Sequence, residues 1–313
     1  MKNLLTICLL TKNNRQVLPE LFDSFTGTGR FLVGDMGSTD GSKIIYEKYA
    51  AQHVQIKDKA DMSTAKNELL TYVKTPWVLF VEPWEKLVTD LPDIANLKHG
   101  DYNVQVLDNG VISKATRLWH TSANNKFVNP VYEIIDSKSP MFADCILYSG
   151  TSTNLLDGKS LLKKWRADKP TSPLPMYYEA FSYLEDKNYD EFIRSTQNYL
   201  FMENTGVSAV MMRYYLACVY LYVKNDFRKA MAQAQACVGI NPLMAEFWCI
   251  LGDVLYATRN YRHSFEMYEN AKIMGTQRLK SDPWPFHIVK YQEYPEKMQQ
   301  NCMELLKTPL PTH

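Results

Sequence analysis

Short apolar runs alternate with helical spacing through the first quarter of the chain. The runs that read as strands are LLTICLLT (4–11), FLVGD (31–35), VQIK (54–57) and WVLFV (77–81). Apolar residues between them recur at helical intervals, at Val17, Leu18, Leu21, Phe22 and Phe25, then Ile44, Ile45, Tyr49 and Ala50, then Leu69, Leu70 and Val73. Asp61, Ser63 or Thr64 is a suitable cap for the third helix. This alternation predicts a parallel α/β sheet with helices on both faces.

Polar residues follow three of these strands directly. They form the segments Thr11–Asn14, Asp35–Asp40 and Glu82–Glu85. In parallel sheets ligands bind at the carboxyl ends of strands, near a reversal of strand order. The three segments are therefore expected to converge on one crevice.

The next stretch predicts further strands at YNVQVL (102–107), GVISKATRLW (110–119) and CILYSG (145–150). We expect these strands to be antiparallel. Asp108-Asn109-Gly110 is a hairpin-turn sequence between the first two, because Asn and Gly tolerate positive φ.

Helical spacing replaces the strand pattern from about residue 156. Two stretches match at an offset of 34 residues, which is the length of a tetratricopeptide repeat. The matched positions are Tyr214, Leu221, Ala230, Ala234, Cys237 and Pro242 against Trp248, Leu255, Ser264, Tyr268, Ala271 and Thr276. Asp226-Phe227 and Asn260-Tyr261 share the offset, and Asn188-Tyr189 marks an earlier, degraded copy. The sequence thus predicts two domains, an α/β domain over 1–155 and a tetratricopeptide-like solenoid over 156–313.

Composition narrows the class of protein. The chain has 313 residues, 46% of them hydrophobic, and a formal net charge of +1. Bulk charge therefore favours neither nucleic acid nor membrane as a partner. The six cysteines form no CxxC pair, which argues against a zinc site or disulfide framework and suits a reducing cytoplasm. No apolar run reaches the length of a membrane span.

Three motifs in the first half carry candidate chemistry. TKNN (11–14) ends the first strand, DMGSTD (35–40) ends the second, and DMSTAKN (61–67) opens a helix. In this order they resemble the family 2 glycosyltransferases of the GT-A fold, most closely members with tetratricopeptide repeats behind the catalytic domain. The resemblance covers nearly the whole chain. It is strong over 4–85, patchy over 86–155 and repeat-like beyond.

The resemblance implies a nucleotide-sugar site. Asp35 would hold the base, Thr11 and Asn13 would line the same wall, and Lys66 would face the base or diphosphate. The full set of implied donor-binding residues is Thr11, Asn13, Asp35, Ser38, Asp40, Lys66, Asn67, Glu82 and Trp84. Uridine is the default base, so the expected donor is a UDP-sugar.

One departure from the family concerns the metal. The family's Asp-x-Asp-Glu segment after the fourth strand appears here as Glu82-Pro83-Trp84-Glu85. Trp84 stands where the metal-binding acid belongs, and an indole does not ligate Mg²⁺ or Mn²⁺. Tyr132 and Tyr148 likewise stand where relatives carry histidines. We therefore expect no divalent metal.

Two hypotheses follow. In the first, the chain is a metal-independent, inverting glycosyltransferase with Glu133 as general base and Glu85 as the other candidate. Positive charge and hydrogen bonds for the diphosphate or acceptor would then come from Arg117, Lys126, Tyr132, Tyr148, Lys163 and Lys164. In the second, the chain is a catalytically inactive binding or adaptor protein. Segment 159–169, which holds both lysines, also suits a solvated helix face.

The acceptor stays open at this point. A solenoid suits a protein or peptide acceptor, or association between copies of this chain. The basic segment 159–169 and the cluster Arg259, Arg262 and His263 suit a modified DNA base instead.

Overall fold

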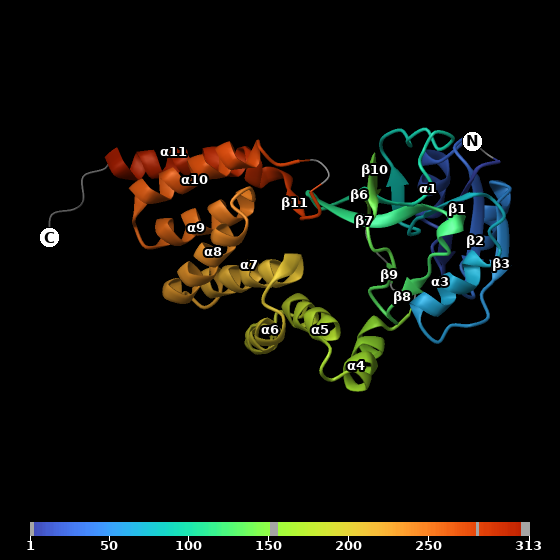
Figure 1. Cartoon of the computed structure of the whole chain (residues 1–313), viewed down its shortest axis with the longest axis horizontal. Coiled ribbons are helices and arrows are strands. Elements are labelled where there is room, and N and C mark those ends of the chain that lie inside the picture. The colour runs from blue at the N-terminus through green and yellow to red at the C-terminus, as the bar shows by residue number, and fades with distance from the viewer. Residues whose placement is uncertain (1–2, 151–155, 280–281, 308–313) are drawn as a thin grey trace. The chain divides into compact units, whose positions relative to one another are not determined.

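The computed structural model of the protein describes residues 3–150, 156–279 and 282–307. It divides into two compact units, Met1–Trp165 and Arg166–His313. A mixed sheet organises the first unit and helices make up the second (Figure 1). The domain boundary expected at residue 155 falls in 151–155, outside the described residues.

The first unit contains the sheet and its covering helices. Its strands are β1 Leu5–Thr11, β2 Arg30–Asp35, β3 Gln52–Gln55, β4 Trp77–Phe80, β5 Glu85–Leu87, β6 Asp101–Asp108, β7 Val111–His120, β8 Phe127–Val128, β9 Ile134–Ile135 and β10 Met141–Ser149. Its helices are α1 Leu18–Ser24, α2 Ser42–Lys48, α3 Met62–Leu70 and the 3₁₀ turn η1 Thr121–Ala123. Helix α4, Gly158–Asp168, spans the division between the units.

Strand order in the main sheet is β3-β2-β1-β4-β7-β6-β10-β5. The first four strands are parallel, as predicted, and β7 joins β4 in the antiparallel sense. The expectation of antiparallel pairing was wrong for β10, which runs parallel to β6 and antiparallel only to β5. The segment between β7 and β10 contains the separate β8–β9 pair and brings the chain back to the start of β6, so β10 runs in the same direction as β6.

Helices cover both faces of the parallel strands, as the alternation predicts. Leu5, Ile7 and Leu9 of β1 belong to one apolar cluster with the buried side of α1. Cys8 and Leu10 belong to the opposite cluster, which includes buried residues of α3. All seven residues of β1 are buried, so this strand is the centre of the unit.

Local boundaries follow from turn and cap chemistry. Asp61 caps α3 by accepting the N–H of Thr64, and Asn109 (φ 47°) and Gly110 (φ 78°) form the predicted hairpin turn. Two expectations were wrong in detail. Strand β3 lies two residues before the predicted 54–57: it begins at Gln52, opposite Leu32, and the N–H of Lys57 goes to Glu68. Around α2 the fully buried ring is Tyr46, which was not predicted; the predicted Ile45 and Tyr49 pack partly against the core, whereas the predicted Ile44 is 64% exposed.

The second unit is a row of helix pairs (Figure 1). Its elements are α5 Pro173–Glu185, α6 Tyr189–Met202, α7 Gly206–Tyr222, α8 Phe227–Ile240, α9 Ala245–Ala257, α10 Tyr261–Gly275, β11 Phe286–His287, η2 Ile288–Tyr291 and α11 Glu293–Lys307. The residues that marked the repeat, Asn188, Asp226 and Asn260, are the N-caps of α6, α8 and α10. The 34-residue offset is therefore the separation between the starts of equivalent helices, α8 and α10.

Gly252 allows α9 and α10 to approach closely. A Cβ at this position would lie 2.8 Å from the ring of Tyr268. That ring is fully buried, and its hydroxyl donates to Asp253 at 2.6 Å, so it has no free direction in which to move. The segment 248–252, which begins with Trp248, thus places its glycine at a helix–helix contact.

No helix within the described ranges is long and apolar enough to cross a bilayer.

We predict that Gly252→Ala lowers the free energy of unfolding by about 1–3 kcal/mol, through overpacking against Tyr268. The matched control is Gly239→Ala in α8, where an added Cβ meets nothing within 4 Å. That change should raise stability by about 1 kcal/mol, because alanine is the better helix former. Urea unfolding followed by circular dichroism measures both, and equal effects of the two substitutions would contradict the packing account.

Candidate functional site

The loop after β2 is organised by Asp35. Its Oδ1 accepts the backbone N–H groups of Gly37 at 2.9 Å and Ser38 at 2.8 Å, and its Oδ2 accepts the hydroxyl of Tyr46 at 2.9 Å. Gly37 has φ 99°, which explains the glycine in the motif. Asp35 therefore holds the loop in shape, and its contact with a nucleotide base stays a prediction.

The loops after β1 and β2 are tied to each other. Asn13 donates its N–H to Ser38 at 3.0 Å and accepts the N–H of Thr39 at 2.7 Å. Asp40 accepts the N–H of Arg15 at 2.9 Å. The structure thus brings together the predicted polar segments at the ends of β1 and β2.

Thr11 belongs to the same loop region. It is fully buried and donates its hydroxyl to Asn14 at 3.1 Å. The TKNN motif is therefore hydrogen-bonded within itself as well as to the neighbouring loop.

A buried group of charges lies at the carboxyl end of β4. The ammonium of Lys66, on α3, lies 2.6 Å from Glu82 Oε1 and 2.5 Å from Glu133 Oε1. The Lys66 side chain is 1% exposed and rests on the rings of Phe80 and Phe127. An ammonium at this depth needs carboxylate partners, since burying an unpaired charge is costly.

Arg117, on β7, extends this group to Glu85. Its Nη1 donates to Glu82 at 3.2 Å and its Nη2 to Glu85 at 3.4 Å. Glu85 also accepts the backbone N–H of Glu82 at 2.8 Å. We call these five residues, Lys66, Glu82, Glu85, Arg117 and Glu133, the ion cluster. It holds two cations and three carboxylates, so it is not electropositive as it stands.

The cluster shifts the pKa values of its members. Burial disfavours charged Lys66, but Glu82 and Glu133 outweigh it and raise the pKa of the ammonium. Burial pushes the pKa of Glu82 upward, but Lys66 and Arg117 outweigh it and lower that pKa to about 2. For Glu85, burial outweighs the attraction of Arg117 and raises the pKa. Glu82 is thus held ionised, while Glu85 is the easier of the two to protonate.

Trp84 and Tyr148, two of the three aromatic replacements, meet at one cavity. They line a space of about 100 Å³ together with Glu85 and Gln16. Tyr132 does not line this cavity; it has φ 51° and its side chain is 38% exposed. Its neighbour Glu133 is the residue that reaches the ion cluster.

The remaining predicted residues lie outside the cluster. Asn67 pairs with the backbone of Phe127, donating to its C=O at 2.9 Å and accepting its N–H at 2.8 Å. Lys126 lines a separate cavity beside Asn67. Lys163 and Lys164 are exposed on α4, as a solvated helix face would be. Asn67 thus fixes the β8 segment, which precedes Glu133.

Sequence reasoning missed Tyr46 and the pairing within the ion cluster. Tyr46 gave no signal, because a tyrosine on a short helix reads as an ordinary apolar residue. Each charged member was a candidate residue, Arg117 only as a source of positive charge, but the pairing joins residues as far apart as Lys66 and Glu133. No local spacing could have indicated it.

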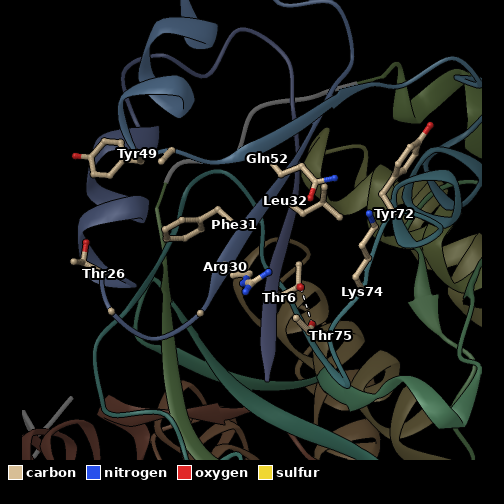
Figure 2. Close-up of a pocket in the computed structure, with 13 residues that line it drawn as sticks. Thr6, Thr26, Arg30, Phe31, Leu32, Tyr49, Gln52, Tyr72, Lys74 and Thr75 are labelled. Carbon is tan, nitrogen blue, oxygen red and sulfur yellow. Dashed lines mark hydrogen bonds between the residues drawn. The ribbon is translucent and has the colours of Figure 1, made fainter. Parts of the chain in front are cut away.

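Larger cavities lie away from the predicted residues. One, of about 530 Å³, is lined by Thr6, Arg30, Gln52 and Thr75 at the starts of the parallel strands and by Lys74 and Tyr49 (Figure 2). Another, of about 710 Å³, is lined by residues 87–93 and the end of α1. Ligands of parallel sheets bind at the opposite edge, where the motif residues converge, so we place the candidate site there.

The donor set does not suit a divalent cation. Glu82 Oε1 already lies between Lys66 and Arg117, and both oxygens of Glu85 are engaged. Within the described ranges, no group of three His, Cys, Asp or Glu residues has the geometry of a metal site. Lys66 and Arg117 therefore already occupy the carboxylate oxygens that a divalent cation would need.

No protein-family model matches the sequence, and no curated protein matches it. Similar solved structures include MamA 41-end from Desulfovibrio magneticus RS-1, at 18% identity and TM-score 0.35, covering 47% of this chain and 83% of that one. They also include the first TPR of Spaghetti (RPAP3) bound to HSP90 peptide SRMEEVD, at 13% identity and TM-score 0.35, covering 44% of this chain and 94% of that one. These neighbours are tetratricopeptide-like helical repeat proteins. The glycosyltransferase resemblance of the first half stays a prediction.

We predict that the ion cluster contributes acid-sensitive stability through Glu82. Its pKa is lower in the folded state than in the unfolded chain, so its contribution is present above about pH 5 and is lost as pH falls towards about 2. Glu82→Gln should cost about 3–5 kcal/mol at pH 7, because it leaves Lys66 and Arg117 short of a partner. The variant should also lack this part of the acid dependence.

Urea unfolding of both proteins between pH 7 and pH 2 measures these effects. Glu85→Gln is the control within the same cluster. Because burial already favours the protonated form of Glu85, this variant should lose less stability at pH 7 than Glu82→Gln. The reverse order would refute the assignment of the two pKa directions.

Proposed function

We propose that the chain is a glycosyltransferase that takes a nucleotide sugar, by default a UDP-sugar, at the carboxyl edge of β1, β2 and β4. The observation that carries this proposal is the convergence of the polar loops and the ion cluster at that edge. Strand β1 has β2 on one side and β4 on the other, so strand order reverses beside these residues. That reversal is where open α/β sheets bind nucleotides.

In this proposal the buried ammonium of Lys66 and the half-buried guanidinium of Arg117 would turn from their carboxylate partners to the diphosphate and take the place of a metal ion. Lys66 and Arg117 both lie at the end of β4, next to the loop that carries Trp84. The Nε–H of Arg117 is a buried donor without a hydrogen-bond partner among the described residues. A buried donor without a partner is costly, and a ligand oxygen would relieve it. These features support binding of a diphosphate without a divalent metal.

The reaction proposed is a single displacement at the anomeric carbon. The acceptor nucleophile forms the new glycosidic bond as the bond to the diphosphate breaks, and the diphosphate leaves with the electron pair. Glu133 takes the proton of the acceptor, and Glu85 is the second candidate for this role. Inversion of the anomeric centre follows from a single step.

A binding or adaptor function is the second candidate, and one observation favours it. Every carboxylate of the ion cluster has an internal cation within 3.4 Å. The neighbouring cavity measures about 100 Å³, whereas small-molecule sites usually offer roughly 300–1,000 Å³. A domain whose carboxylates are all paired and whose cavity is this small would have a structural role, and binding would then belong to the helical unit.

A protein or peptide is the favoured acceptor or partner in both cases. Helical repeats of this kind present extended surfaces that suit extended chains. The alternative of a modified DNA base rests on exposed basic residues, including Lys163 and Lys164 on α4 and Arg262 on α10. These residues also suit solvated helix faces. Association between copies of the chain through the repeats is a further role for the same surface.

We predict that UDP or a UDP-sugar binds with an affinity unchanged by EDTA, measured by calorimetry with and without Mg²⁺ or Mn²⁺. Arg117→Met should weaken binding about tenfold or more, because a buried charge-assisted contact contributes about 1.5–3 kcal/mol. Arg30→Met is the matched control, since Arg30 lines the cavity at the opposite edge of the sheet.

Three outcomes separate the candidates. Loss of affinity only in Arg117→Met supports the carboxyl-edge site. Loss only in Arg30→Met would move the nucleotide to the other cavity. Absence of binding by any nucleotide sugar, in a protein that unfolds cooperatively, would favour the adaptor function.

A further inference from the structure

The connection between α10 and α11 is unusually long for a helical repeat. It runs from residue 276 to 292, whereas helix–helix connections usually take roughly 2–8 residues. Its described parts, residues 276–279 and 282–292, hold no regular element but the two-residue β11 and the 3₁₀ turn η2. We call residues 282–291 the insert. Long irregular connections inside compact units commonly have a function.

The insert is anchored to acidic residues of α9. Glu246 accepts the backbone N–H of His287 at 2.7 Å and the hydroxyl of Tyr291 at 2.9 Å. The ammonium of Lys290 lies 3.9 Å from Asp253. Both acids are buried, with Glu246 1% exposed. A backbone N–H held by a fixed carboxylate is a contact that any extended peptide can make.

Aromatic contacts extend from α9 to α7. The ring of Trp284 meets Phe247 edge-on at 6.1 Å, and His287 lies 6.2 Å from Tyr214 of α7. Helices α7 and α9 are the first helices of consecutive repeats and contact each other. The insert therefore lies on a surface that equivalent helices of neighbouring repeats form together.

The α10 end of the connection holds the insert in place. Arg278 donates to Asp282 at 3.3 Å, to the C=O of Pro285 at 2.9 Å and to the C=O of Trp284. Gly275 leaves room for Tyr291, because a Cβ there would lie 2.6 Å from that ring. These contacts fix the insert, a short strand followed by a 3₁₀ turn, against α9 and α10.

We propose that the surface of α7 and α9 around Glu246 and Asp253 is a peptide-binding surface, occupied here by the chain's own insert. The ligand it fits is an extended peptide with aromatic and basic residues, which competes with the insert. This inference does not depend on the transfer reaction proposed above.

The chemistry of the surface sets the class of partner. Glu246 is a buried acid whose donors come from the insert, so an acidic peptide would be rejected and a basic one accepted. Tyr214 and Phe247 are apolar rings that suit an aromatic side chain. The insert also leaves one group unsatisfied, since His287 Nε2 is buried without a partner among the described residues. A competing peptide that places no unpaired polar atom at this position would avoid that cost and bind more tightly than the insert.

The test uses the full chain with residues 282–291 replaced by a Gly/Ser linker of equal length. A fluorescent peptide with the sequence DPWPFHIVKYQ (282–292) is titrated against it and followed by anisotropy. We expect binding to the linker variant that is at least about tenfold tighter than to the unaltered chain, because a tethered competitor acts at roughly millimolar effective concentration.

Matched variants locate the contact. In the linker background, Glu246→Gln should weaken peptide binding about tenfold, since it removes a charge-assisted acceptor. Glu266→Gln, at an exposed acid of α10, should leave it unchanged. A peptide in which the lysine is replaced by glutamate should bind more weakly than the parent.

Three results would overturn the proposal. Equal affinity for the linker variant and the unaltered chain would show that the insert does not cover the surface. No binding to a linker variant that keeps its helical spectrum and cooperative unfolding would show that there is no peptide site. Loss of the helical fold in that variant would make the insert part of the core.

Discussion

The buried ammonium of Lys66 is the constraint around which the first unit is arranged. Removing an ammonium from water costs several kcal/mol, and only well-placed carboxylates offset that cost. Glu82 comes from the end of β4 and Glu133 from the segment before β9, so pairing with Lys66 draws α3, β4 and that segment together. Arg117 then brings β7 and Glu85 into the same group. The carboxyl edge of the sheet is therefore defined by charge neutralisation as much as by strand pairing.

Local features of this fold could be predicted from the sequence because they depend on nearby residues. Asp61 as a helix cap, the Asn109-Gly110 turn and the equivalent caps Asp226 and Asn260 all follow from one residue and its immediate neighbours. The parallel strands could be predicted because continuous apolar runs indicate strands buried on both faces. The direction of β10 could not be predicted, since it depends on which end of β6 the long connection after β7 brings the chain to.

The candidate site was predictable as a set of positions but not as an arrangement. The motifs placed polar residues at the ends of β1, β2 and β4, and the structure brings the loops after β1 and β2 together through Asn13 and Ser38. Charge partners depend on long-range geometry, so the contact of Lys66 with Glu133 had no sequence signal. The same limit applies to the second unit. There Asp253 accepts hydroxyls from Tyr222, Tyr268 and Tyr294, which belong to three different helices.

The composition of the ion cluster has a consequence for how this chain can diverge. Glu82 serves both Lys66 and Arg117, so a change at one position leaves a buried charge unmatched at another. A substitution that removes the charge of Arg117 would leave Glu85 without its cation, and one that removes Lys66 would leave Glu133 without its cation. A second substitution at the partner carboxylate would restore the balance of charge. The five positions should therefore be inherited as a covarying block, whereas the exposed lysines of α4 are free to vary independently.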